Sequence, residues 1–251
     1  MDALLRSRPL NTATEEEVAV ETPVALTVNG VSQAVMLATP ADLDDFALGF
    51  GIAEGWFASP RELLDVEPTT QPDGIELALT VTAGCEQRLR QRRRTLAGRT
   101  GCGLCGVESL AQLGAVRPAA VTAPELVDGA LARALAALPA AQPLNARCGG
   151  LHGAAWCQPD GTLLLAREDI GRHNALDKLT GALARRGVDT GDGFVLMSSR
   201  ASHELVHKAA MAGVGLLACM SAPSSLAIAT ARDLGLQLWA FVREGRATRY
   251  A

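Results

Sequence analysis

The residues best suited to chemistry in this chain are two cysteines, Cys102 and Cys105, in a stretch that reads Thr-Gly-Cys-Gly-Leu-Cys-Gly from residue 100 to residue 106. The glycines leave the backbone free to bend sharply or to approach a ligand closely. An arginine-rich stretch, residues 87–94, and Arg99 lie just before the cysteines. A thiol reacts as its thiolate, and nearby cations favour that form. The pattern therefore indicates sulfur chemistry, metal binding or an anion held beside sulfur.

Two familiar roles fit this cysteine pair poorly. A structural zinc site needs four ligands, usually from two such pairs, and Cys148 and Cys157 are too far apart in sequence to form the second pair. No structural zinc is therefore expected. A thioredoxin-like redox motif opens a helix, which the surrounding glycines oppose. The remaining interpretation is a reactive thiol on a loop that accepts a group in one place and delivers it in another.

A second motif, His203-Glu204-Leu-Val-His207, matches the HExxH signature of zinc proteases on a predicted helix. That chemistry needs a third ligand, and no histidine follows position 207. We therefore interpret the histidine spacing as accidental, with a zinc hydrolase as a distant alternative. The zinc deaminase pattern is missing too, because the chain contains no H-x-E.

Polar residues also collect where predicted strands end. Residues 167–178 form a dense polar block at a strand-to-helix turn, and similar turns follow three further strands. Strand ends and helix N-termini commonly hold phosphorylated ligands. The candidate ligand-binding residues are His152, Arg172, His173, Asn174, Asp177, Lys178, Ser198, Arg200, Ser221, Phe241, Val242, Arg243, Glu244, Gly245 and Arg246.

Composition limits the class of protein. Of the 251 residues, 48% are hydrophobic and 4% aromatic, so Ala, Leu and Val must fill the core, and a net charge of −4 argues against a general nucleic-acid binder. No apolar run is long enough to cross a membrane, and the N-terminus lacks the apolar segment of a signal peptide. A cytoplasmic protein with reduced thiols is therefore expected. Cys85, Cys157 and Cys219 are expected to be buried as small apolar residues.

The order of elements predicts an α/β protein. Residues 1–16 are expected to be disordered, residues 17–118 to form a smaller N-terminal α+β domain that carries the cysteine loop, and residues 119–251 to form a three-layer α/β domain. In the first domain, strands at 24–28 and 31–37 flank the turn formers Asn29 and Gly30. A helix from residue 39 to about 57 follows, with Thr39 as its N-cap, and then a strand at 75–81 and a weak helix at 107–113.

In the second domain, helices alternate with strands. Strands are expected at 154–157, 162–166, 194–198, 215–220 and 236–242, and helices at 124–138, 173–186, 203–212 and 224–233.

Taken together, these segments resemble the FdhD family of formate dehydrogenase accessory sulfurtransferases. The resemblance rests on residues 39–50, the cysteine stretch, residues 149–152, 167–178 and 198–208, and Ser221-Ala-Pro. It implies a cytidine-deaminase-like fold without zinc for the C-terminal domain, and a homodimer. Four positions depart from the family pattern: Cys148 replaces a threonine, Ser199 replaces a glycine, and His203 and His207 stand where the family does not require histidine.

The resemblance also implies a function. A cysteine desulfurase would load sulfur onto Cys102 as a persulfide, with Cys105 assisting transfer. The sulfur would pass to the molybdenum cofactor in its bis-guanine-dinucleotide form, which formate dehydrogenase receives, and Phe241–Arg246 would belong to the cofactor-binding stretch. The alternative is a chaperone that binds the cofactor and uses no covalent sulfur step. Whether the client enzyme uses molybdenum or tungsten, and whether the arginines of residues 88–99 face the desulfurase or the cofactor phosphates, stays open.

Overall fold

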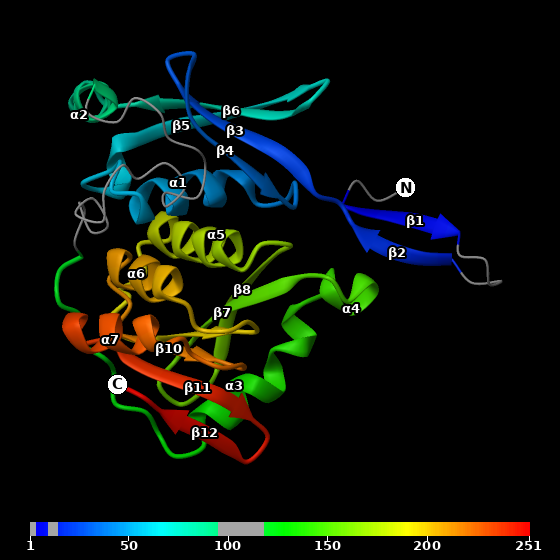
Figure 1. Ribbon diagram of the computed structural model, residues 1–251, viewed down its shortest axis with the longest axis vertical. Coiled ribbons are helices and arrows are strands. Elements are labelled where there is room, and N and C mark those ends of the chain that lie inside the picture. The colour runs from blue at the N-terminus through cyan, green and yellow to red at the C-terminus, as the bar shows by residue number, and fades with distance from the viewer. Residues whose placement is uncertain (1–3, 10–14, 95–117) are drawn as a thin grey trace.

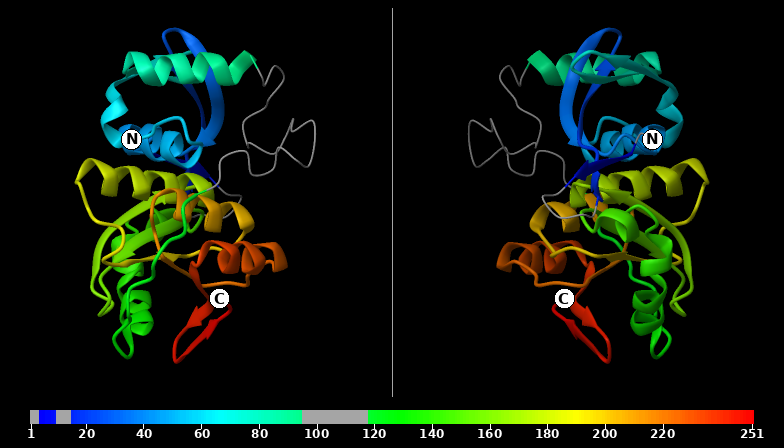
Figure 2. Two further views of the ribbon diagram at one scale, coloured as in Figure 1. Left: turned by 90° about the vertical axis from the view of Figure 1, so that its left-hand side faces the viewer. Right: turned by 90° about the vertical axis from the view of Figure 1, so that its right-hand side faces the viewer.

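The computed structural model describes residues 4–9, 15–94 and 118–251 (Figure 1). Cys102, Cys105 and the helix expected at 107–113 lie outside these ranges. A four-stranded sheet with helix α1 (Leu43–Ala53) stacks on a six-stranded sheet that helices cover on both faces. Helix α1 faces α5 (Arg172–Arg185) between the two sheets (Figures 1 and 2). Within the described ranges, no helix is long and apolar enough to cross a membrane.

The four-stranded sheet has the order β4-β3-β6-β5. The predicted hairpin is confirmed: β3 (Thr22–Val28) and β4 (Val31–Ala38) pair antiparallel across Asn29 and Gly30, whose φ angles are 51° and 71°. The predicted strand at 75–81 is also confirmed as β6 (Gly74–Val81), parallel to β3. Strand β5 (Leu63–Gln71) was not predicted, because most of its residues are exposed and do not alternate between polar and apolar.

Helix α1 (Leu43–Ala53) is shorter than predicted, and Thr39 is not its N-cap. That position belongs to Asp42, which has a left-handed φ of 52° and makes no side-chain capping bond. Thr39 bonds to the C-terminal part of the chain instead: its Oγ1 accepts a hydrogen bond from the Ile170 amide at 3.1 Å. A 3-10 turn, η1 (Pro60–Glu62), and helix α2 (Ala83–Arg94) complete this part.

The N-terminus differs from the expected disorder. Strands β1 (Leu5–Pro9) and β2 (Glu15–Ala19) pair antiparallel and extend from the body as a narrow arm (Figure 1). Pairing of the two strands supplies the backbone hydrogen bonds that a disordered segment would make with water. The arm is fastened to the C-terminal part of the chain through Glu17 in the middle of β2, which accepts two hydrogen bonds from the Arg147 guanidinium.

The six-stranded sheet has the order β12-β11-β10-β9-β7-β8. The strands are β7 (His152–Cys157), β8 (Leu163–Asp169), β9 (Phe194–Met197), β10 (Leu216–Cys219), β11 (Gln237–Arg243) and β12 (Arg246–Arg249). Strands β9, β10 and β11 are parallel, and the other pairs are antiparallel. All but β12 were predicted; the sequence of β12, Arg-Ala-Thr-Arg, resembles a polar loop.

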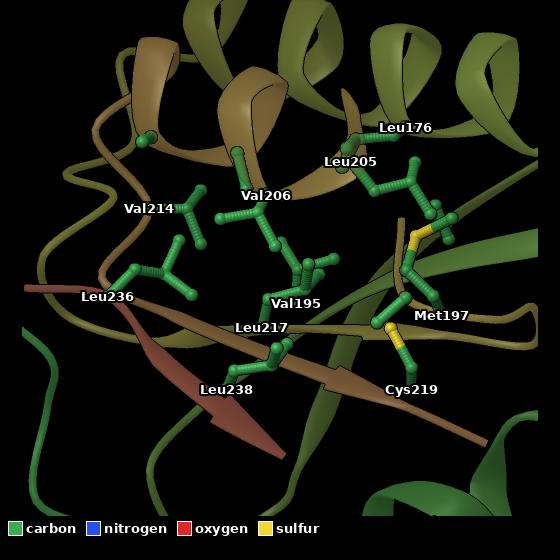
Figure 3. Packing of buried hydrophobic residues seen from close by; sticks show 14 of the residues in the cluster. Leu176, Val195, Met197, Leu205, Val206, Val214, Leu217, Cys219, Leu236 and Leu238 are labelled. Atoms are coloured by element: carbon green, nitrogen blue, oxygen red, sulfur yellow. The ribbon is translucent and has the colours of Figure 1, made fainter. Parts of the chain in front are cut away.

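Helices cover both faces of this sheet, which confirms the predicted α/β layers. On one face lie α5 (Arg172–Arg185), α6 (His203–Met211) and α7 (Ser225–Leu234). Figure 3 shows Leu176, Leu205 and Val206 of these helices above Val195 and Leu217 of the strands. The opposite face packs against α3 (Ala130–Ala137). A 3-10 turn, η3 (Pro139–Ala141), and the short helix α4 (Asn145–Cys148) lead to β7. The likeness to cytidine deaminases and the boundary near residue 118 stay predictions.

Helix α3 begins later than the expected residue 124, because Gly129 has a left-handed φ of 77° and stands at its N-cap.

Two glycines bring α1 and α5 into backbone contact. A Cβ at Gly49 would lie 1.7 Å from the carbonyl oxygen of Asp177, and one at Gly181 would lie 1.9 Å from that of Asp45. No side chain other than hydrogen fits at either position. The N-terminal sheet is therefore attached to the C-terminal part through a close helix crossing.

Candidate functional site

The predicted strand ends meet along one edge of the six-stranded sheet. His152 at the start of β7 lies opposite Asp169 at the end of β8, and Ala154 lies opposite Met197 at the end of β9. The row continues through backbone bonds from the Ser221 amide to Ser199 at 3.3 Å and from the Phe241 amide to Ser221 at 3.2 Å. From β11 to β8 it crosses four strand spacings, about 19 Å at about 4.8 Å each.

We call this row the polar strand edge. Its members are His152, Arg172, His173, Ser198, Arg200, Ser221 and Phe241.

The end of the row at β7 and α5 carries three cationic or imidazole side chains. His152, Arg172 and His173 are each partly exposed. Burial lowers the pKa of His152, and the positive charges of Arg172 and His173 lower it further. His152 is therefore mainly neutral near pH 7. The Nε atom of Arg172 is buried and has no acceptor among the described residues.

Helix α6 contributes the acid that faces His173. The Glu204 Oε2 lies 2.8 Å from His173 Nε2, and Ser202 Oγ lies 3.4 Å from the same nitrogen. The hydrogen bond from His173 is the main cause that lowers the pKa of Glu204, and the charges of Lys208 and Arg172 act in the same direction. Glu204 is therefore a carboxylate at neutral pH.

The HExxH residues do not converge on a common point. While Glu204 pairs with His173, His203 Nδ1 lies 2.7 Å from Thr230 Oγ1 on α7. Among the residues that the structure describes, no cluster of three His, Cys, Asp or Glu could bind a metal ion. The geometry gives the zinc-hydrolase alternative no support.

The serines in the middle of the row make hydrogen bonds within the loops that follow the strands. Ser198 Oγ accepts a hydrogen bond from the Gly153 amide at 2.9 Å, which joins the end of β9 to the start of β7. Ser199 is buried and donates to the Arg200 carbonyl, while the Arg200 side chain is exposed. Ser221 is partly exposed. Hydroxyl groups and the exposed guanidinium of Arg200 therefore line the centre.

The end of the polar strand edge at β11 is built around Phe241. This residue has a left-handed φ of 51°, at an irregularity in the pairing of β11 with β12. The guanidinium carbons of Arg243 and Arg246 lie 5.7 Å and 6.0 Å from the centre of its ring. The exposed turn residues Glu244 and Gly245 join them. A cavity of about 440 Å³ opens beside this turn, against Trp239 and residues 124–132. Two like charges beside one ring favour an anionic partner.

Four predicted residues lie away from the surface of the row. Val242 is 1% exposed and packs in the core beneath α3. Asn174, Asp177 and Lys178 are enclosed between the two parts of the chain. The structure therefore does not bring these four side chains to the polar strand edge with the others.

The enclosed side chains hold the two parts together. Lys178 Nζ lies 2.6 Å from Asp169 Oδ2 and donates to the Thr39 carbonyl at 2.8 Å. Asn174 donates to the Leu37 carbonyl at 2.7 Å, and Lys208 Nζ lies 2.9 Å from Asp177 Oδ2. These contacts fix the start of α5, and with it the place of Arg172 and His173.

Sequence reasoning missed Thr39 and Asp169 as the residues that organise this end. Asp169 Oδ2 accepts from the Thr39 amide at 2.9 Å, and Asp169 Oδ1 accepts from the Gly171 amide at 2.7 Å. The only available signal was the polar block at 167–178, which does not reveal a partner 130 positions earlier. The predicted residues Cys102 and Cys105 lie outside the described ranges.

The described cysteines behave as expected. Cys85, Cys157 and Cys219 are buried, and burial raises the pKa of Cys157 to about 12. Burial also raises the pKa of Cys85 and of Cys219. These thiols are therefore protonated and poorly reactive at neutral pH. Cys148 is partly exposed at the end of α4.

The chain matches the family model described as FdhD/NarQ over residues 19–251. It is 53% identical over 226 residues to the "Sulfur carrier protein FdhD" of Variovorax paradoxus, which covers 90% of this chain and 81% of the relative. It is 46% identical over 252 residues to the protein of the same name from Bordetella petrii, covering 99% and 91%.

Among solved structures, the fold is similar to a Desulfotalea psychrophila protein described as a candidate formate dehydrogenase accessory protein. The TM-score is 0.70 at 22% identity, over 98% of this chain and 94% of that one. This likeness shows the fold, and the family model together with the relatives identifies the lineage: the chain belongs to the FdhD/NarQ family.

Proposed function

We propose that this protein is a sulfur carrier that accepts sulfur from a cysteine desulfurase and delivers it to the molybdenum cofactor required by formate dehydrogenase. Cys102 holds the sulfur as a persulfide, and Cys105 assists transfer. The family match over residues 19–251, which contains the complete Cys-x-x-Cys motif, is the observation that carries the proposal. Relatives that share about half of their residues with this chain bear the name sulfur carrier protein.

The chemistry of loading needs a thiolate. Cys102 attacks the outer sulfur of the persulfide on the desulfurase, a new S–S bond forms, and the cysteine of the desulfurase leaves as its thiolate. The arginines at 88–99 favour the attacking thiolate. The buried Cys85, Cys157 and Cys219 do not compete, because burial keeps their thiols protonated.

The cofactor is proposed to bind at the polar strand edge in its bis-guanine-dinucleotide form. Arg172 supplies positive charge at one end of the row, and Arg243 and Arg246 supply it at the other. The row is about 19 Å long, which suits a ligand with phosphates far apart better than a single small anion. We further propose that the protein acts as a homodimer in the cytoplasm, which light scattering of the purified protein would test for the dimer.

The decisive test is the intact mass of the protein after incubation with an active cysteine desulfurase and cysteine. Wild-type protein should gain one sulfur atom that dithiothreitol removes, and Cys102→Ala should not. Cys148→Ala is the matched control, because Cys148 is a partly exposed free thiol away from the motif and should leave the gain intact.

The alternative function predicts a different result. A cofactor chaperone without a sulfur step would show no mass gain in the wild-type protein, and Cys102→Ala would still support maturation of formate dehydrogenase.

A further inference from the structure

Helix α2 (Ala83–Arg94) is attached to the protein by a narrow apolar stripe. Within residues 83–91, only Cys85 and Leu89 are buried, and both belong to the core of the N-terminal part. Cys85 also donates a hydrogen bond to the Trp56 carbonyl at 3.4 Å. Because the two buried residues are one helical turn apart, the rest of the helix surface is left to solvent or to a partner.

The exposed surface of α2 carries an excess of positive charge. The helix contains one acid, Glu86, and five arginines: Arg88, Arg90, Arg92, Arg93 and Arg94. Arg88 pairs with Glu62 of η1 at 2.5 Å, and Arg90 pairs with Glu86. These two carboxylates leave an excess of three positive charges, on a protein whose net charge is −4. An excess of this kind on one helix attracts an acidic partner.

The arginines of α2 lie far from the polar strand edge. The helix packs on the four-stranded sheet, and Figures 1 and 2 show it at one end of the long axis of the molecule, with the β11–β12 hairpin at the other end. Helices α1 and α5 lie between them. Arg88 and Arg90 have side chains that are 46% and 64% exposed, and they do not face a ligand bound along that edge. Of the two roles considered for these arginines, contact with a protein partner therefore fits the fold better than contact with the cofactor phosphates.

Covalent geometry keeps the reactive thiol near α2. Cys102 follows Arg94, the last residue of the helix, by eight positions. Eight residues span at most about 29 Å in any conformation. A protein that meets Cys102 must therefore come within this distance of the end of α2, and a standard interface covers about 800 Å² of each partner. The exposed side of α2 is thus within reach of a protein that exchanges sulfur with Cys102.

We propose that α2 is the docking surface for the sulfur donor, and that its arginines bind an acidic surface beside the active-site cysteine of that donor. The inference rests on the proposed function, because it needs a protein that loads Cys102. It adds the surface that brings the two thiols together and the charge that the donor must present there. Attraction between opposite charges acts mainly on the rate of encounter, and salt weakens it.

A matched pair of variants tests the docking surface. The α2 variant replaces three arginines of the helix with glutamine: Arg90, Arg92 and Arg93. The control variant makes the same change at three exposed arginines of the C-terminal part: Arg133, Arg232 and Arg249. Both variants lose the same charge, and both keep Arg94 and Arg99 beside the cysteine stretch. Circular dichroism of each variant verifies that it is folded.

The initial rate of sulfur gain is then measured at increasing concentrations of this protein, with a fixed amount of an active cysteine desulfurase and cysteine. An exposed charge pair typically changes an affinity about twofold or more. The α2 variant should therefore raise the KM of the desulfurase for this protein about tenfold and leave kcat unchanged, while the control variant should change neither. Added salt should raise the KM of the wild-type protein more than that of the α2 variant.

Glutathione persulfide is a donor without a protein surface, and it should load the wild-type protein and both variants at the same rate. Slower loading of the α2 variant by this donor would mean that the arginines act on the thiolate, which would overturn the docking proposal. A wild-type KM in the α2 variant, or an equal rise of KM in the control variant, would overturn it too. None of these results would remove the sulfur gain on Cys102. If the wild-type protein gained no sulfur from either donor, the proposed function itself would fail, and this inference with it.

Discussion

Replacing Lys178 with methionine should strongly destabilise the protein, because it leaves a buried carboxylate without its cation. Lys178 and Asp169 are both 0% exposed, and their charged atoms are 2.6 Å apart. Breaking such a pair by removing one partner costs about 3–5 kcal/mol. Asp169 keeps donors from Thr39, Gly171 and Asn174, so we expect the lower value, about 3 kcal/mol.

Urea unfolding followed by circular dichroism measures this loss. With a slope near 3 kcal/mol per molar urea, the midpoint should fall by about 1 M. The matched control is Arg185→Met, which breaks an exposed pair with Asp44 and a longer contact of 3.5 Å with Asp45, while Asp45 keeps its partner Arg167. Such surface pairs contribute about 0–1 kcal/mol. The variant Lys178→Met with Asp169→Asn should lose less stability than the two single changes added together, because it leaves no buried charge.

A loss below about 1 kcal/mol in Lys178→Met, or one no larger than in Arg185→Met, would refute this reasoning. It would mean that Asp169 is protonated or reaches water once the lysine is gone, and that the two parts of the chain do not depend on this pair.

Three further predictions concern packing, pH and thiol reactivity. Gly181→Ala should cost about 1–3 kcal/mol, since its Cβ would lie 1.9 Å from a carbonyl oxygen of α1. The exposed Gly84→Ala should cost less, because its Cβ would meet only the end of the Arg88 side chain, at 3.7 Å; thermal melts compare them, and equal losses would contradict the close crossing. The lowered pKa of Glu204 stabilises the fold above the ordinary value near 4.5, and this contribution is lost as pH falls through the lower folded value. Glu204→Gln should therefore melt below wild type at pH 7 and approach it in acid; a constant difference would speak against the ion pair. In a variant lacking Cys102 and Cys105, Cys148 should react quickly with a thiol reagent, whereas the buried Cys85, Cys157 and Cys219 should react only after unfolding; rapid reaction of all four thiols would show that the burial is wrong.

The sequence predicted the elements whose signals are local. Asn29-Gly30 determines a hairpin by its own backbone preference, and short apolar runs such as Phe194–Met197 indicate buried strands. The polar residues at the ends of β9, β10 and β11 lie at one edge of the sheet because these three strands are parallel. Two of the missed strands, β5 and β12, lie at sheet edges and are held by pairing with a neighbour rather than by their own apolar pattern.

The functional residues were likewise found where their signal was local and missed where it depended on a distant partner. Exposed polar residues such as His173 and Arg246 were found because they follow strands. Lys178 was assigned to the ligand because it belongs to the polar block at residues 167–178. Its side chain is instead buried with Asp169 and the Thr39 carbonyl. Thr39 is 130 positions from Asp169. A partner so distant leaves no mark in the local sequence, so neither the buried network nor the true start of α1 could be inferred.

The close crossing of α1 and α5 has a consequence for synthesis on the ribosome. Gly49 and Thr39 leave the exit tunnel long before Gly181 and Asp169, since 130 positions separate Thr39 from its partner. At about 5–20 residues per second, this interval lasts on the order of 10 s. During that time, the nascent N-terminal sheet displays the α1 surface that α5 will later cover. The final docking of the two parts is therefore timed by translation, and a slow codon stretch between them would lengthen the exposure of that surface.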